Sequence, residues 1–179
     1  MTVTLYHYTC GHKLQGIAKA EHLAPSAVPP WATHEQGILW FSENPIYEAS
    51  ACKPMMNPAT GEKIFNVDLL RDRIGLYRFA LGFDVEYDVR KWPQIAAVAR
   101  IREPQRVTLA VAGMGMGAEP SQWWGSVLAC PLELLSLEGL TDDGWTPITM
   151  EDALIEFHNK QITVASYSEH KKEISGVTA

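Results

Sequence analysis

The chain contains two segments, residues 5–26 and 37–52, in which strand-forming residues lead directly into a helix-like pattern. In residues 3–8, VTLYHY, the residues alternate and are rich in β-formers, which predicts a strand. In residues 13–23, KLQGIAKAEHL, the apolar residues follow helical spacing, and Pro25 ends the pattern. This arrangement allows few folds, because it places polar groups where a strand stops and a helix starts.

The second segment repeats this organisation. Residues 38–42, ILWFS, predict a strand. Asn44 suits a helix N-cap and Pro45 suits a first helical turn, so we expect a helix to start at Pro45.

The rest of the chain alternates between short strands and a few helices. Thr149, followed by two acidic residues, favours a helix start, because these groups complement the helix dipole. We predict strands over 64–70, 74–83, 107–112 and 122–129, helices over 92–103 and 150–160, loops over 25–37 and 53–63, a glycine-rich loop over 113–121, and a strand or short helical segment over 132–139. This order favours an α+β fold over repeated βαβ units.

The size and composition predict one soluble domain. The chain has 179 residues, of which 46 % are hydrophobic and 20 % charged. We expect the domain to span residues 1–165 and a polar C-terminal tail to span 166–179. No apolar run is long enough to cross a bilayer, and no signal peptide is evident, so we expect no membrane partner and a cytoplasmic location.

Cysteine usage and charge exclude some function classes. The three cysteines are far apart and form no CxxC pair, which indicates neither a zinc site nor a disulfide framework. His7 and His12 have no third ligand at a plausible spacing, so we expect no metal. The net charge of −6 argues against broad electrostatic binding to nucleic acid.

Four polar or aromatic side chains stand at the ends of the two predicted strands. His7 and Thr9 share one strand face, and Trp40 and Ser42 share a face of the other strand. Together they suit a flat ligand that carries an amide, because aromatic rings stack and short polar groups hold amides. The alternatives are an interior role for His7 and core packing for Trp40.

These residues lie in motifs that resemble a known family. LYHYT and GILWFSENPIYEASA resemble the first two motifs of the ADP-ribosyltransferase superfamily, in its diphtheria-toxin and poly-ADP-ribose polymerase branch. The resemblance covers the first 52 residues best. It implies a single domain in which two packed antiparallel sheets form a split β core with flanking helices, and it implies NAD as substrate. The chain also resembles small phage and bacterial proteins that begin with LYHYTC.

The resemblance implies a role for each motif residue. His7 would bind the NAD ribose and Thr9 would support it, while Tyr8 stands where many members have glycine. Trp40 or Phe41 would stack on the nicotinamide, and Ser42 would occupy the small position. The NAD-binding residues implied in this way are His7, Tyr8, Thr9, Trp40, Phe41, Ser42 and Tyr47.

The third motif departs from the family pattern. The family has a glutamate on a late strand after a mobile loop, and its expected place here is the start of QWWGSVLA. Gln122 occupies that place, and Glu119 lies three positions earlier. We predict Glu119 as the catalytic acid, with Gln122 binding the ribose or orienting the acceptor. Glu133 and Glu138 lie further along than the pattern requires.

Three functions follow from the resemblance. The leading one is an NAD-dependent mono-ADP-ribosyltransferase with a macromolecular acceptor, either protein or nucleic acid. The second is a catalytically inactive NAD-pocket relic that acts as a protein-binding module, for example in a phage–host contest. The third is RNA 2′-phosphate transfer through NAD, which ranks lower because no Arg or Lys cluster lies beside the first two motifs.

Overall fold

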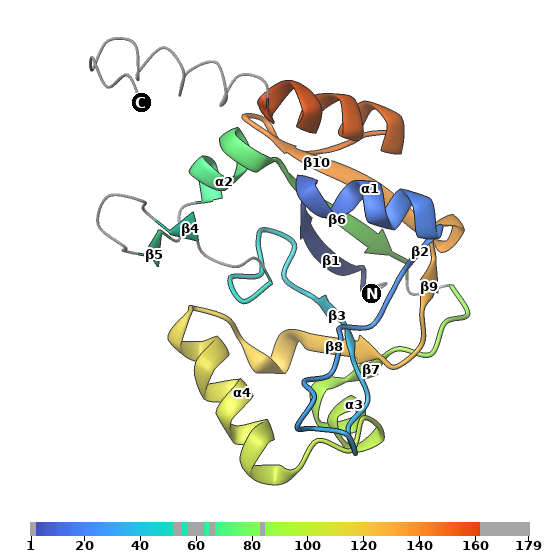
Figure 1. The fold of residues 1–179 in the computed structure, drawn as a ribbon, viewed down its shortest axis with the longest axis vertical. Helices are drawn as coiled ribbons and strands as arrows, with labels where there is room; N and C mark the ends of the chain where they lie inside the picture. The colour runs from blue at the N-terminus through green and yellow to red at the C-terminus, as the bar shows by residue number, and fades with distance from the viewer. Residues whose placement is uncertain (1–2, 52–54, 57–62, 65–66, 83–84, 162–179) are drawn as a thin grey trace, which may run out of the picture.

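The structure is a computed structural model that describes residues 3–51, 55–56, 63–64, 67–82 and 85–161. The predicted tail of residues 166–179 and most of the predicted loop 53–63 lie outside these residues. The described part contains one seven-stranded antiparallel sheet in the order β11-β10-β6-β1-β3-β8-β7 (Figure 1). Its strands are β1 (Leu5–Cys10), β3 (Leu39–Ser42), β6 (Leu76–Leu81), β7 (Arg90–Lys91), β8 (Trp123–Ser126), β10 (Leu135–Thr141) and β11 (Gly144–Pro147).

The strand pairing within the sheet is shortest between β1 and β3. β1 pairs with β6 along its whole length, from Leu5↔Leu81 to Cys10↔Leu76. It pairs with β3 only through Tyr6↔Ser42. This seam divides the sheet into a four-stranded half, β11-β10-β6-β1, and a three-stranded half, β3-β8-β7. The predicted α+β class is confirmed, whereas two packed sheets are wrong, because the two halves stay hydrogen-bonded in one sheet.

Helices cover both halves (Figure 1). On the four-stranded half lie α1, α2 and the helix that starts at 150 and is described as far as 161; on the three-stranded half lie α3 and α4. The helix bounds are α1 (Gly11–Ala20), α2 (Val67–Ile74), α3 (Trp92–Val98) and α4 (Glu103–Gly115). The smaller elements are β2 (His22–Leu23) paired with β9 (Cys130–Pro131), β4 (Met55–Met56) paired with β5 (Lys63–Ile64), and the 3-10 turns η1 (Pro120–Gln122) and η2 (Leu132–Leu134).

The main core lies between the four-stranded half and its helices. Alternate residues of the strands point to one face, and there Leu5 and Phe79 pack with Leu14 of α1 and Ala153 of the C-terminal helix. All four are at most 2 % exposed. Burying one such large apolar side chain contributes about 1.5–3 kcal/mol. The sequence pattern of the first segment therefore builds the core that holds β1 and α1 together.

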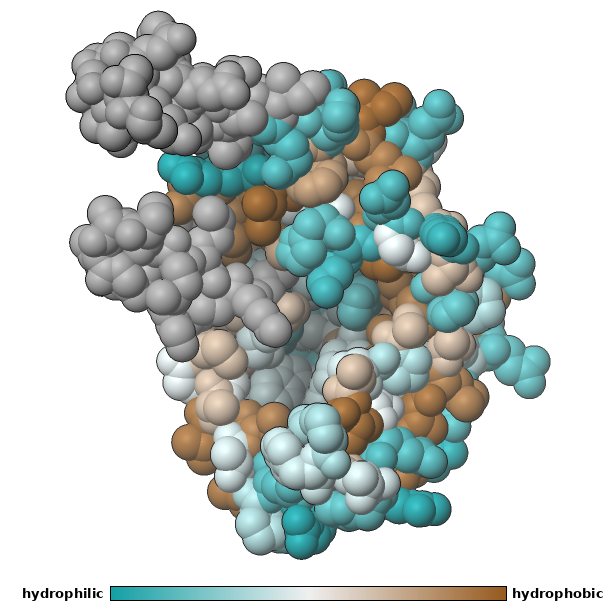
Figure 2. Space-filling view, viewed as in Figure 1, coloured by the Kyte–Doolittle hydropathy of each residue, from teal (hydrophilic) through white to brown (hydrophobic). Residues whose placement is uncertain are grey.

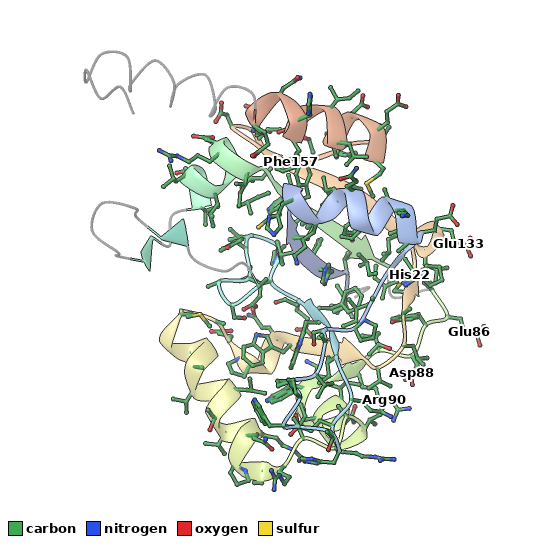
Figure 3. All side chains as sticks on the ribbon, viewed as in Figure 1. His22, Glu86, Asp88, Arg90, Glu133 and Phe157 are labelled. Carbon is green, nitrogen blue, oxygen red and sulfur yellow. The ribbon has the colours of Figure 1, made fainter. Side chains whose placement is uncertain are left out.

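The chain passes from β1 into α1 without a linker. The Gly11 N–H donates a hydrogen bond to the Gly75 carbonyl at 3.2 Å. A Cβ at position 11 would lie 2.4 Å from the Ile74 carbonyl oxygen and 2.3 Å from the ring of Phe157, which Figure 3 labels. Glycine is therefore required here by close approach of the backbone.

Two predicted strands are wrong, because the residues are helical. Residues 107–112 lie inside α4, where Pro104 stands at the helix start and Glu103 in the first turn. Residues 67–70 of the predicted strand 64–70 lie in α2, which has Asp68 in its first turn and basic residues in its last. These end signals outweigh the β-propensity of the interiors, because they satisfy and complement the helix termini.

Three further boundaries also differ. The predicted helix at Pro45 is wrong, since residues 43–48 are bent or irregular and residues 49–51 form a turn. The predicted helix 92–103 is divided, because Arg100 adopts a left-handed conformation with φ of 60° between α3 and α4. The predicted glycine-rich loop 113–121 starts later, because α4 continues to Gly115.

The described residues contain no cluster of His, Cys, Asp or Glu that could hold a metal ion. Cys10 and Cys130 are buried free thiols, and burial raises the pKa of Cys130 to about 11. Across the described residues, every helix is too short or too polar to cross a bilayer.

Candidate functional site

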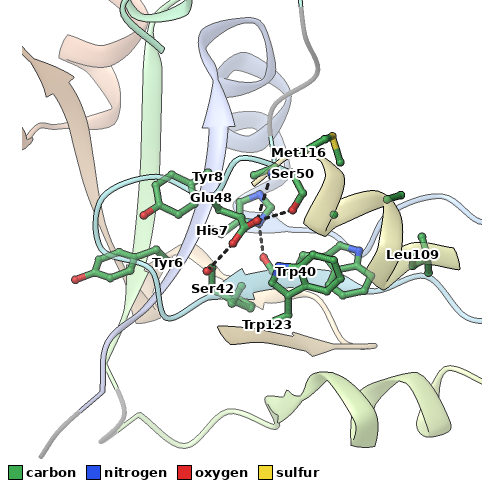
Figure 4. A pocket seen from close by; sticks show the side chains of 14 residues that line it. Tyr6, His7, Tyr8, Trp40, Ser42, Glu48, Ser50, Leu109, Met116 and Trp123 are labelled. Atoms are coloured by element: carbon green, nitrogen blue, oxygen red, sulfur yellow. Dashed lines mark hydrogen bonds between the residues drawn. The ribbon is translucent and has the colours of Figure 1, made fainter. Parts of the chain in front are cut away.

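A cavity of about 310 Å³ opens at the seam where β1 and β3 separate, and we call it the seam cavity. Its walls come from β1, β3, the turn after β3, α4 and the start of β8. Figure 2 shows the molecular surface hollowed beside α4, and Figure 4 shows the side chains that line the cavity. The two sequence motifs thus meet at one concave site.

His7 fills the point at which the β1–β3 ladder stops. In antiparallel register the pairs after Tyr6↔Ser42 would be His7 with Phe41 and then Tyr8 with Trp40, but the ladder contains only Tyr6↔Ser42. Instead, the His7 Nδ1–H donates to the Trp40 carbonyl at 2.8 Å. A carbonyl only accepts, so this bond assigns the proton of a neutral ring to Nδ1 and leaves Nε2 as an acceptor.

Burial lowers the pKa of His7 from its usual 6.5, and the hydrogen bond to Trp40 opposes this shift in part. The ring is therefore neutral at pH 7. A neutral imidazole with a free Nε2 lone pair accepts a hydrogen bond from a ligand hydroxyl.

Two tryptophans, Trp40 and Trp123, line one side of the site and pack against a third, Trp92. The ring of Trp40 lies 5.2 Å from that of Trp92 and 5.9 Å from that of Trp123, centroid to centroid. Trp40 therefore packs in a core cluster and also lines the seam cavity. Trp123 lines the cavity as well, and a Cβ at Gly113 of α4 would lie 2.4 Å from its ring.

The turn after β3 is fixed to the four-stranded half by its carbonyl groups. The carbonyls of residues 44–46 each accept a hydrogen bond from a side chain there; the donors are Tyr8, Arg78 and Trp145. The Asn44 side chain also accepts from the N–H groups of Ile46 and Tyr47, at 2.9 and 3.4 Å. A helix from residue 45 would need these carbonyls for its own N–H groups, so these bonds favour the turn.

This turn brings Glu48 into the seam cavity. Its side chain is buried, with 5 % exposure. Ser42 Oγ donates to Oε2 at 2.9 Å, and Ser50 donates to Oε1 from Oγ at 2.6 Å and from its N–H at 3.3 Å, as Figure 4 shows for the hydroxyl contacts. Glu48 is the one carboxylate among the described residues that line this cavity.

The predicted catalytic residues lie elsewhere. Glu119 is exposed and Gln122 is partly buried, and neither lines the seam cavity. Gln122 Nε2 donates to Glu119 Oε2 at 2.7 Å, so the two predicted groups pair with each other. Gln122 does stand directly before β8, the late strand beside β3, as the sequence motif predicts.

A second cavity of about 660 Å³ adjoins the first, and we call it the α1 cavity. It shares His7, Tyr8 and Trp40 with the seam cavity. His12 and Lys13 of α1 are among its other lining residues. The two cavities therefore form compartments that adjoin at His7.

Most of the predicted ligand residues meet here. Five of the seven line the seam cavity: His7, Tyr8, Trp40, Phe41 and Ser42. Thr9 lines the α1 cavity. Tyr47 is not among the lining residues of either, and its ring lies 5.8 Å from that of Tyr8.

Sequence reasoning missed Glu48 because it placed residues 45–51 in a helix. The useful signal was Asn44, whose side chain bonds the backbone two residues on and thereby favours a turn as readily as a helix cap. Comparisons of the chain with protein-family models, with curated proteins and with solved structures found no match.

Proposed function

We propose that the protein is an NAD-dependent mono-ADP-ribosyltransferase, which breaks the nicotinamide–ribose bond and passes ADP-ribose to a macromolecular acceptor. The observation that carries this proposal is the meeting of two cavities at His7, in the seam between the strands of the two family-like motifs.

The seam cavity suits the nicotinamide. Trp40, Trp123 and Tyr8 supply aromatic surface for a flat ring, and Glu48 supplies negative charge. The nicotinamide ring of NAD is a pyridinium cation, which favours both kinds of group.

His7 suits the ribose, and the α1 cavity suits the rest of NAD. The Nε2 atom of His7 is the acceptor left by the bond to Trp40, and a ribose hydroxyl donates to such an acceptor. Lys13 supplies positive charge, and a ring N–H of His12 supplies a further donor, near a diphosphate. This placement leaves the anomeric carbon between the two compartments.

The reaction needs no group beyond NAD and the acceptor. The bond between the anomeric carbon and the ring nitrogen breaks, and its electron pair neutralises the pyridinium, so nicotinamide leaves. An oxygen or nitrogen of the acceptor then bonds the anomeric carbon and loses its proton. The acceptor is a protein or a nucleic acid, and the geometry of the seam cavity favours neither class.

A second candidate is an inactive NAD pocket that serves as a protein-binding module. It is favoured by Gln122 at the place of the family glutamate and by the apolar surface of α4 beside the cavity. There Val107, Val111 and Met114 are 54 %, 57 % and 55 % exposed, and exposed apolar groups of this kind favour protein contacts.

The test is NAD binding by calorimetry, together with nicotinamide release measured by chromatography. We expect the wild type to bind NAD, and His7→Ala to weaken binding about tenfold through loss of one hydrogen bond. His34→Ala is the control, because that ring is exposed and outside both cavities. A wild type that does not bind NAD at millimolar concentration would overturn the proposal. Binding without nicotinamide release, with protein and nucleic-acid acceptors present, would favour the inactive module.

A further inference from the structure

We propose that Glu48, and not Glu119 or Gln122, is the carboxylate that faces the positive charge of NAD in the seam cavity. This inference rests on the proposed function and names the charged residue of that site. Glu48 lies within the second motif, but the family resemblance assigns no such role to it, so the inference depends on the tertiary structure.

The Glu48 carboxylate is held in place before any ligand arrives. Its two oxygens accept from Ser42 and Ser50, and the turn that carries it is fixed to the four-stranded half through the carbonyls of residues 44–46. Charge held in advance in a dry site stabilises a developing opposite charge without reorganisation. Oε2 has a single donor in these contacts, which leaves acceptor capacity toward the cavity.

The buried Glu48 carboxylate is compensated by hydrogen bonds from neutral groups and not by a cation among the described residues. Within the described residues, the ion pairs found involve other carboxylates, and the donors to Glu48 are neutral serine groups. A buried carboxylate is costly unless an opposite charge or strong hydrogen bonds offset the cost. A cationic ligand ring between the aromatic walls supplies that opposite charge.

The same carboxylate suits the reaction. As the bond to the ring nitrogen breaks, positive charge moves from the pyridinium to the ribose, and both positions adjoin one cavity. Glu119 lacks this setting, because it is exposed and paired with Gln122 outside the cavity.

The experiment compares NAD with its reduced form, NADH, whose nicotinamide ring is neutral, in wild type, Glu48→Gln and Glu119→Gln. Glutamine keeps the shape: its Oε1 can still accept from Ser50, and its Nε2 can donate to the Ser42 hydroxyl oxygen. We expect the preference for NAD over NADH to fall about tenfold in Glu48→Gln and to stay within about twofold in Glu119→Gln, because only Glu48 adjoins the ring. Nicotinamide release should fall about a thousandfold in Glu48→Gln.

The outcomes distinguish the assignment of Glu48 from the proposed NAD-dependent function. An unchanged preference in a folded Glu48→Gln variant, or loss of release in Glu119→Gln alone, overturns the assignment to Glu48 and leaves the proposed function standing. Failure of the wild type to bind NAD overturns both. If Glu48→Gln does not fold, Glu48→Asp, which keeps the charge and withdraws it by one methylene, should bind NAD with the wild-type preference reduced, and a preference equal to that of wild type contradicts the proposal.

Discussion

The segments that follow β1 and β3 have similar sequence patterns and different structures. After β1, Gly11 starts α1 at once, and Leu14 of that helix is buried in the main core. After β3, the chain turns, because the carbonyls of residues 44–46 accept from side chains of the other half of the sheet. The helix contributes to the core. The turn contributes to the seam cavity, because it brings Glu48 back to Ser42 at the end of β3.

The comparison shows what decides between helix and turn after a strand. Apolar spacing gives α1 a face to bury, so tertiary packing stabilises the helix. The segment after β3 has Ile46 77 % exposed and finds more stabilisation in hydrogen bonds to fixed side chains. Four predictions test this contrast.

The largest effect is expected at the start of α1. Gly11→Ala should reduce the free energy of unfolding by about 3 kcal/mol, because the new Cβ meets the backbone of Ile74. Gly16→Ala is the matched control, since no atom lies within 4 Å of its added Cβ, and alanine should stabilise the helix by up to about 1 kcal/mol. Urea unfolding measures both, and equal changes at the two positions would contradict the close approach at Gly11.

The next effect tests the support of Glu48 by the turn. Ser42→Ala removes the one hydroxyl that donates to Oε2 and also loses the acceptor of the Asn44 N–H, so we expect a loss of about 2 kcal/mol. Ser50→Ala keeps the backbone N–H of residue 50 as a donor and should cost about 1 kcal/mol. Chemical denaturation compares the two, and a greater loss in Ser50→Ala would argue against this order.

A smaller effect tests one attachment of the turn. Trp145→Phe removes the Nε1–H that donates to the Ile46 carbonyl at 2.8 Å and keeps most of the ring packing. We expect a loss of about 1 kcal/mol and weaker NAD binding, because the turn positions Glu48. Trp31→Phe is the control, since Trp31 is 73 % exposed. Thermal unfolding and NAD titration provide the measurements, and equal results for the two variants would refute this role of Trp145.

The smallest effect concerns His7 and pH. Burial lowers its pKa below 6.5, so as pH falls below 6.5 the unfolded chain binds a proton that the folded chain does not. Stability should therefore fall with decreasing pH more steeply in wild type than in His7→Asn, and the two slopes should agree above this range. Urea unfolding at a series of pH values measures the slopes, and parallel slopes at acidic pH would contradict a neutral buried His7.

The sequence predicted the elements whose stability is local or follows from clear periodicity. β1, α1 and β3 lie where the alternation and the helical spacing place them, within a few residues. β8 and the helix from residue 150 also agree. α4 could not be identified from β-propensity, because residues 107–112, VTLAVA, are mostly apolar and include β-branched Val and Thr. The proline and the acidic residue at its start were the better signal.

The sequence by itself indicated that His7 and Trp40 take part in one polar and aromatic site, although His7 lies in the middle of β1 and not at its end. Only the tertiary structure decided which carboxylate joins that site. Glu119 follows a late helix in the expected order along the chain, yet it is exposed and lies outside the cavity. Glu48 lies inside because Tyr8, Arg78 and Trp145, all distant in sequence, donate hydrogen bonds to the carbonyls of its turn. Local propensity alone predicts a helix for this segment. Long-range hydrogen bonds of this kind leave no periodic signal in the sequence, since their partners come from three different strands.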